Sequence, residues 1–121
     1  MDPSGLRPLT ECEKKSLSPY IPKEDLDKAD LRIGETPWWL PRDFIGITRG
    51  NRIDFRPRVY SADGSAESLA LLGHELTHVG QYRDGMNRLK YLVSCLSGYG
   101  NSKYEIAANK LQQQILHDLS K

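Results

Sequence analysis

The sequence predicts a small α+β domain in which a short β-sheet precedes a group of helices. Two segments with alternating apolar and polar residues flank a glycine-containing turn at residues 49–51, as in a β-hairpin. After residue 65, apolar residues recur at helical spacing over most of the chain. The 121 residues suffice for one hydrophobic core but not for two. We therefore expect a single domain over residues 1–121.

The first 40 residues contain short elements but no motif that indicates a function. Leu6 to Ser18 favours a short helix, because Pro19 would end it. Asp30 to Gly34 is typical of a short strand. Pro37 to Pro41 predicts a loop whose two tryptophans either cover the core or form one wall of a substrate cleft. The role of residues 1–40 is therefore open.

The hairpin is predicted to pair Phe44–Thr48 with Arg52–Arg56. Its apolar members are expected on one face, opposite the charged ones; they are Ile45, Ile47, Ile53 and Phe55. Pro57 follows directly and cannot donate to a ladder, so the second strand is expected at a sheet edge. Four arginines surround the hairpin, at positions 49, 52, 56 and 58. They either form a solvated edge or favour acidic peptide residues.

Three helices are expected after the hairpin. The first covers about 65–83 and buries a face formed by Leu69, Leu72, Leu76 and Val79. The second covers roughly 86–96 and the third about 102–119, separated by the glycine-containing segment 97–101.

Composition excludes several classes of protein. Seventeen basic and sixteen acidic residues give a net charge of +1, which offers no reason to expect nucleic acid or an anionic membrane as partner. Two cysteines are too few for a disulfide framework. The start of the chain lacks the pattern of a secretory signal, and no apolar run is long enough to span a membrane. We therefore expect a cytoplasmic protein; its oligomeric state stays open.

The residues that indicate chemistry are His74-Glu75-Leu76-Thr77-His78. Side chains four residues apart lie on one face of a helix, so both imidazoles can bind one metal ion. Glu75 occupies the position of a general base that takes a proton from the attacking water. This pattern predicts a Zn²⁺ site with His74 and His78 as ligands and Glu75 as the catalytic base. The alternative is an accidental histidine pair on a surface helix.

A catalytic zinc site usually has a third protein ligand. Glu105 is one candidate, because a helix that crosses the motif helix would direct this carboxylate inward. Asp84 is the other, six residues after His78, where metzincins place their third ligand. That arrangement needs a glycine three residues after the second histidine, and Gln81 stands there. We favour Glu105.

The segment Leu71 to Tyr82, followed by Tyr104-Glu105-Ile106-Ala107-Ala108, resembles the minigluzincins, small proteins related to the DUF4157 group of predicted metallopeptidases. The resemblance extends from about Asp43 to Gln114. It implies a minimal zincin-like fold in which an edge strand borders the cleft. It also implies zinc bound by His74, His78 and Glu105, with Glu75 as general base.

Two functions follow from this sequence. The first is a gluzincin-type zinc peptidase, a hydrolase in which an extended peptide or protein substrate pairs with the strand near Ile53 to Arg56. The second is a zinc-stabilised binding or accessory module without turnover. Candidates for a donor to the developing oxyanion are Tyr82, Tyr91, Tyr99, Tyr104 and His117, and the sequence does not rank them.

Overall fold

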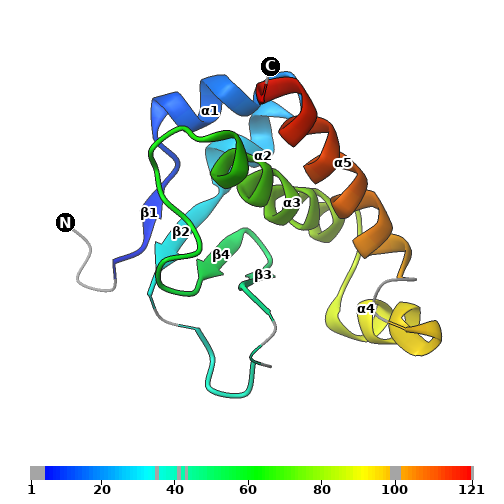
Figure 1. The fold of residues 1–121 in the computed structure, drawn as a ribbon. Coiled ribbons are helices and arrows are strands. Elements are labelled where there is room, and N and C mark those ends of the chain that lie inside the picture. The colour runs from blue at the N-terminus through cyan, green and yellow to red at the C-terminus, as the bar shows by residue number, and fades with distance from the viewer. Residues whose placement is uncertain (1–4, 35, 41, 43, 99–101, 121) are drawn as a thin grey trace.

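A computed structural model describes residues 5–34, 36–40, 42, 44–98 and 102–120. The described residues form a four-stranded open sheet and five α-helices, so the predicted α+β class is confirmed (Figure 1). The strands are β1 (Arg7–Pro8), β2 (Asp30–Ile33), β3 (Gly46–Arg49) and β4 (Arg52–Phe55). The helices are α1 (Glu11–Leu17), α2 (Lys23–Lys28), α3 (Ala66–Arg83), α4 (Arg88–Ser94), a 3-10 turn η1 (Cys95–Ser97) and α5 (Lys103–Leu119).

The strand order β1-β2-β4-β3 shows that the prediction of an edge position for the second hairpin strand was wrong. β4 lies inside the sheet, with β3 antiparallel on one side and β2 parallel on the other. Leu31 of β2 stands beside Ile53 of β4. Pro57 does not prevent this pairing, because β4 ends at Phe55. The edge strand on this side is β3.

The hairpin register also corrects the predicted faces. Thr48 is paired with Ile53, and Ile47 with Asp54. Directly opposed residues of antiparallel strands share a face, so Thr48 points with Ile53 towards the interior. Ile47 therefore lies on the outer face with Asp54, although its apolar side chain suggested the opposite. The turn begins with Gly50, whose φ of 66° favours glycine.

The outer face carries a buried carboxylate surrounded by arginines. Asp54 is fully buried and forms ion pairs with three guanidinium groups, those of Arg32, Arg49 and Arg52. Arg56 instead donates to the carbonyl oxygens of Phe44 and Leu40 and so attaches the β2–β3 loop to the sheet. These contacts show that the arginines near the hairpin fix its structure.

The first 40 residues complete the sheet and cover α3. The predicted helix over Leu6 to Ser18 begins only at Glu11, because Thr10 caps it and the residues before it pair with β2. Glu13 reaches back to the Thr10 amide and also accepts hydrogen bonds from Arg7 and Tyr60. α2, which the sequence analysis missed, is tied to the end of α3 by the Arg83–Asp25 ion pair.

The core lies between the sheet and the α1, α3 and α5 helices. Its fully buried large apolar side chains come from both halves of the chain: Leu17, Leu31, Ile53, Phe55, Leu72, Leu76 and Ile115. α5 lies across α3, and α4 projects away from both (Figure 1). None of the described helices is both long and apolar enough to cross a membrane.

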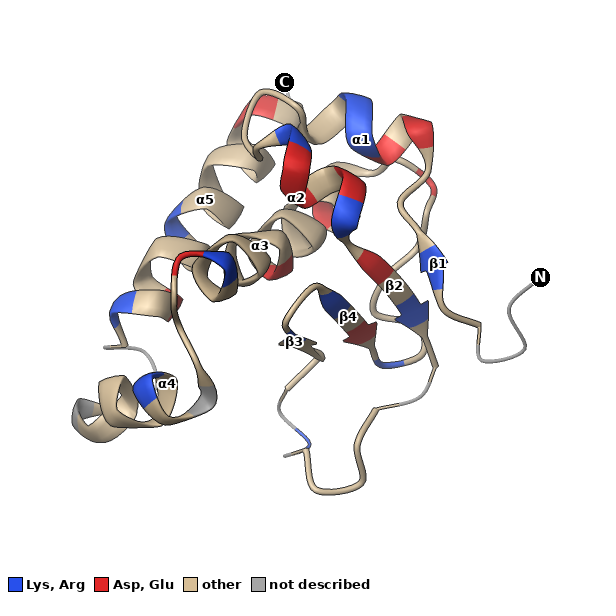
Figure 2. Cartoon of the chain, turned by 180° about the vertical axis from the view of Figure 1, so that it is seen from behind, with Lys and Arg blue, Asp and Glu red and all other residues tan. Residues whose placement is uncertain are grey.

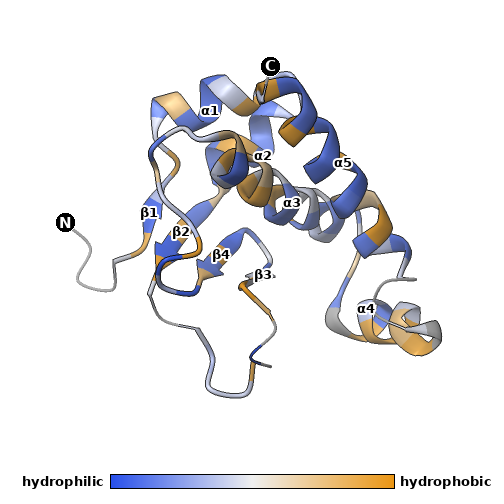
Figure 3. Ribbon diagram, viewed as in Figure 1, coloured by the Kyte–Doolittle hydropathy of each residue, from blue (hydrophilic) through white to orange (hydrophobic). Residues whose placement is uncertain are grey.

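Charge and hydropathy are distributed unevenly. Lys, Arg, Asp and Glu are frequent on α1, α2 and the β2 and β4 strands (Figure 2). Figure 3 shows hydrophobic colouring along much of α4. In α4 and η1, the exposed large apolar side chains are Leu89, Leu92, Val93 and Leu96. A helix that exposes so many such residues has an unusual surface for a monomeric protein.

Candidate metal site

The two histidines of the motif lie one turn apart on the same face of α3. Their ring centroids are 5.1 Å apart and the rings are nearly perpendicular. Both side chains are largely buried, with 13% of His74 and 8% of His78 exposed. The helix is well placed to hold them, because Ser65 caps its start and most of its apolar face lies in the core.

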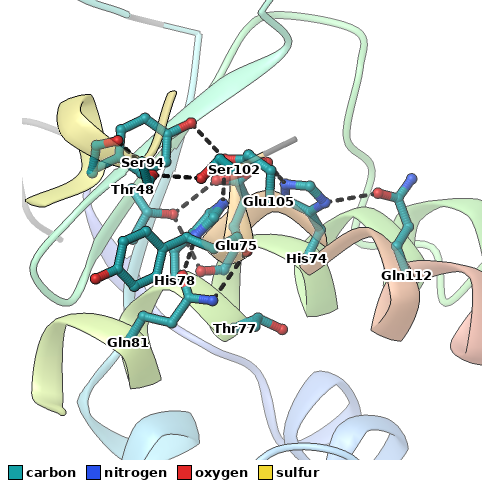
Figure 4. Close-up of polar contacts among 12 residues, drawn as sticks. Thr48, His74, Glu75, Thr77, His78, Gln81, Ser94, Ser102, Glu105 and Gln112 are labelled. Atoms are coloured by element: carbon teal, nitrogen blue, oxygen red, sulfur yellow. Dashed lines mark hydrogen bonds and ion pairs between the residues drawn. The ribbon is translucent and has the colours of Figure 1, made fainter. Parts of the chain in front are cut away.

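Glu105, in the first turn of α5, completes the group (Figure 4). Its Oε1 is 3.0 Å from His74 Nε2, and its Oε2 is 3.0 Å from His78 Nε2. One ligand atom from each residue lies within 4.8 Å of the others. These three residues could therefore hold a metal ion. Asp84, the rival third ligand, is 70% exposed at the end of α3 and pairs with Arg83.

A glycine permits the close approach of the two helices that bring these residues together. Gly73 is buried in α3, next to His74, and a Cβ at this position would lie 2.3 Å from Ile115 Cδ1 of α5. No side chain can therefore fit between the helices at this point without a shift. The missing side chain allows Glu105 and Gln112 of α5 to reach the two imidazoles.

The second ring nitrogen of each histidine, Nδ1, contacts a glutamine side chain. Gln81 Oε1 lies 2.7 Å from His78 Nδ1, and its Nε2 donates to the Tyr104 carbonyl oxygen. The Tyr104 carbonyl can only accept, so it fixes the orientation of the Gln81 amide. His78 Nδ1 must then carry the proton. Gln112 Oε1 makes the corresponding 2.9 Å contact with His74 Nδ1.

When the imidazoles are neutral, this arrangement leaves their Nε2 lone pairs directed at a carboxylate. Two acceptors facing a third acceptor repel one another unless a proton or a cation lies between them. Glu105 Oε1 is buried and has no hydrogen-bond partner among the described residues. Its 3.0 Å approach to His74 Nε2 lacks the alignment of a hydrogen bond. A buried acceptor without a donor therefore faces the point where the three residues converge.

The donor set fits a zinc ion. Imidazole nitrogen and carboxylate oxygen are common zinc ligands, and two histidines with one glutamate form a known catalytic combination. Burial alone would raise the pKa of Glu105, but contacts with His74, His78 and Tyr91 outweigh it and hold this pKa well below its usual range. Burial lowers the pKa of His78, yet the nearby Glu105 and Glu75 raise it overall. An ionised carboxylate beside two imidazole nitrogens thus favours a cation between them, either a proton or a metal ion.

Glu75 lies beside the group without being part of it. It is 6% exposed, and its Oε1 accepts a 2.8 Å hydrogen bond from Thr48 Oγ1 of β3. Thr48 was not predicted from the sequence, because alternation alone assigned Ile47 to the inner face. The hairpin register carries the missing signal: it places a hydroxyl on the inner face opposite the motif helix.

His74, Glu75, His78 and Glu105 open onto one cleft of about 640 Å³, of which they form the floor. One wall comes from the β2–β3 loop and β3: Trp39, Leu40, Phe44, Ile47 and Arg49. The other comes from the end of α3 and from α4: Tyr82, Met86, Tyr91, Leu92 and Cys95. Trp39 thus lines the cleft, the second of the two alternatives for the loop, whereas Trp38 is 94% exposed.

The tyrosine candidates are now distinguishable by position. Tyr91 OH donates a 2.7 Å hydrogen bond to Glu105 Oε2, and its ring stands edge-on to His78. Tyr82 lines the cleft, and Tyr104 contributes its carbonyl to Gln81. His117 is exposed near the end of α5. Tyr99 lies outside the described residues.

Comparisons with known proteins support part of the resemblance. Residues 45–86 match the family model described as the eCIS core domain, which is the DUF4157 family. The match covers the hairpin and α3 with His74, Glu75 and His78, and it ends before Glu105. No curated protein and no solved structure matched the chain.

Proposed function

We propose that this chain is a zinc-dependent peptidase of the gluzincin type, in a minimal zincin-like domain. His74, His78 and Glu105 would hold the ion, and Glu75 would act as general base. The main support is the convergence of two imidazole Nε2 atoms with the unpartnered Glu105 Oε1, beside a second carboxylate and open to a cleft. When bound there, zinc supplies Lewis-acid polarisation of the scissile carbonyl and lowers the pKa of water towards neutrality.

The protein's own residues would orient the metal ligands and transfer the proton. Glu75 accepts a proton from the attacking water and transfers it to the leaving amine. Thr48 donates to Glu75 Oε1, which leaves the other carboxylate oxygen for this proton. Gln81 and Gln112 keep the imidazole protons on Nδ1 and so leave both Nε2 atoms as ligands.

Tyr91 is the best-placed donor for charge that develops on the carbonyl oxygen, because its hydroxyl already lies at the floor of the cleft. We propose this role for Tyr91, and Tyr82, farther along the wall, is the second candidate.

The decisive experiment replaces Glu75 by Gln, which keeps the shape of the side chain and removes its basicity. The zinc content of protein purified without chelator should stay near that of the wild type. Cleavage of an unfolded protein substrate should fall by about 10²–10⁴-fold. Glu67→Gln is a matched control, since Glu67 lies in the first turn of the same helix, away from the cleft.

Two results would contradict the proposal. If the wild type binds zinc but both it and Glu75→Gln are equally inert on a broad set of substrates, the zinc-stabilised accessory module is the correct function. If the protein binds no divalent ion and His74→Ala changes nothing, the site holds no metal.

A further inference from the structure

We propose that the cleft binds an extended polypeptide segment and selects one that places a bulky apolar side chain beside the metal site. This inference deepens the proposed function and rests on it. The walls are mainly apolar, with Trp39, Leu40 and Phe44 on one side and Met86 and Leu92 on the other. Polar ligand and base groups are concentrated at the floor, so a side chain that enters between the walls meets carbon atoms.

Charged substrate side chains would find few partners here. Arg49 is the one Lys or Arg side chain that lines the cleft in the described part of the chain. Its Nη2 is paired with the buried Asp54, and its Nε, which has no hydrogen-bond partner among the described residues, is itself buried. The acidic side chains at the floor are those of the metal site and its base. Many of the other charged residues lie on α1, α2 and the β2 and β4 strands (Figure 2). Desolvating a charge without a partner is unfavourable, whereas burying an apolar group is favourable.

The extended conformation follows from the position of β3. In the sheet formed by the described residues, β3 is the last strand and pairs with β4 alone. Gly46, Ile47 and Thr48 of this strand line the cleft. An extended segment could hydrogen-bond to such an edge, and its alternate side chains would point to the apolar walls. The occupant must also reach His74 and Glu75, which a polypeptide lying along β3 does.

The apolar surface of α4 continues the cleft outward. Leu92, 57% exposed, lines the cleft, whereas Leu89, 71% exposed on the same helix, does not. On the other wall, Trp39 lines the cleft and its neighbour Trp38 does not. Each wall thus offers a residue that should contact the substrate and a matched neighbour of the same type that should not.

The test measures binding and does not depend on turnover. Zinc-loaded Glu75→Gln protein is titrated into a fluorescein-labelled extended peptide with a single central Leu, and into versions with Ser, Asp or Lys at that position. Anisotropy should show the Leu peptide binding roughly 10-fold or more tightly than the Ser peptide, since a buried leucine contributes about this much. The Asp and Lys peptides should bind no better than the Ser peptide.

Variants in the same background locate the binding surface. Leu92→Lys and Trp39→Ala should each reduce the preference for Leu several-fold, whereas Leu89→Lys and Trp38→Ala should leave it unchanged. All four positions are at least 46% exposed, so the variants should fold, which circular dichroism checks.

Several results would overturn the inference. The first is equal binding of all four peptides, and the second is an equal loss of the preference for Leu in the variants at 89 and 92. The third is binding to phosphatidylcholine vesicles that Leu89→Lys abolishes, because this would indicate a membrane-docking surface. Wild-type cleavage of unfolded protein is measured in parallel. Cleavage without an apolar preference refutes only this inference. A preference without cleavage refutes the peptidase and leaves the binding site.

Discussion

The contact between Gly73 and Ile115 provides a quantitative test of how the two helices form the site. An added Cβ would lie 2.3 Å from Ile115 Cδ1, whereas carbon atoms in contact are about 3.5–4.0 Å apart. Gly73→Ala therefore forces a shift of Ile115 or of the whole of α5. Overpacking of this kind costs about 1–3 kcal/mol, and the better helix propensity of alanine offsets about 0.5–1 kcal/mol of it. We expect a net loss of about 0–2.5 kcal/mol in unfolding free energy.

A second substitution distinguishes the contact from a general effect. Ile115→Val removes Cδ1, and the next atom, Cγ1, would lie at an ordinary 3.8 Å from the new methyl group. Alone, Ile115→Val should cost about 0.5–1.5 kcal/mol. In the Gly73→Ala protein it should instead restore stability to within about 1 kcal/mol of the wild type, because the alanine methyl fills the vacated space. The two substitutions should therefore be coupled favourably by about 1 kcal/mol or more.

Urea unfolding followed by far-UV circular dichroism measures all four proteins. Chelator is present throughout, because metal binding to the folded state would otherwise add to stability. Zinc affinity, measured separately, should fall in Gly73→Ala and recover in the double variant, since a shift of α5 moves Glu105 from the histidines. The close helix contact would be refuted if the losses in unfolding free energy of the two single variants added in the double variant. It would also be refuted if the Gly73→Ala protein were more stable than the wild type.

Three further predictions concern side chains around the site and the sheet. Thr48→Val should lower turnover about tenfold or more at unchanged zinc content, measured by peptide cleavage, because Glu75 loses a hydrogen bond to a charged group. Gln81→Leu should weaken zinc binding about 10–100-fold in a competition titration, because His78 loses the acceptor that fixes its proton. Asp54→Asn should destabilise the protein at neutral pH, and urea midpoints measured across pH should show this difference shrinking in acid. Burial raises the pKa of Asp54, but its three arginine partners lower this pKa overall. The ionised carboxylate therefore stabilises the fold fully above the unfolded pKa of about 3.9, and this stabilisation is lost as the pH falls through the lower folded pKa.

Matched controls accompany these predictions. Thr77 donates to the Gly73 carbonyl within α3 and points away from the cleft (Figure 4), so Thr77→Val should keep full turnover. Gln114 is exposed on α5 and donates to Asp118, so Gln114→Leu should keep zinc affinity. Equal effects of the Thr48 and Thr77 variants, or of the Gln81 and Gln114 variants, would contradict the assigned contacts. An Asp54→Asn difference that does not shrink as the pH falls below the unfolded pKa of about 3.9 would contradict the electrostatic account.

Local periodicity predicted α3 and α5 and placed both histidines on one face of α3. The spacing of His74 and His78 needs only one turn of helix, and the bounds of α3 and α5 were predicted to within about one residue. That Glu105 meets them was inferred from the need for a third ligand, and the structure places it there. Whether these residues bind zinc and catalyse hydrolysis stays a prediction.

What the sequence did not indicate depends on pairing between distant segments. β2 lies beside β4, about 20 residues away along the chain, and no local pattern identifies a parallel partner. Because of this pairing, β4 lies inside the sheet and not at the predicted edge. Thr48 was missed for a related reason: register in a hairpin depends on which residues face each other, and the alternation of Ile45 and Ile47 indicated the wrong face.

The position of β4 between β2 and β3 sets a lower limit on how far the protein can be shortened. A fragment cut to residues 45–86 would retain the hairpin, both histidines and Glu75, yet it would leave one side of β4 open to solvent and to other chains. It would also lack α5, and with it Ile115 and the carboxylate that joins the two imidazoles. The recognisable stretch of sequence is therefore smaller than the unit that completes the sheet and brings the three candidate ligands together, and engineered versions should retain both flanks.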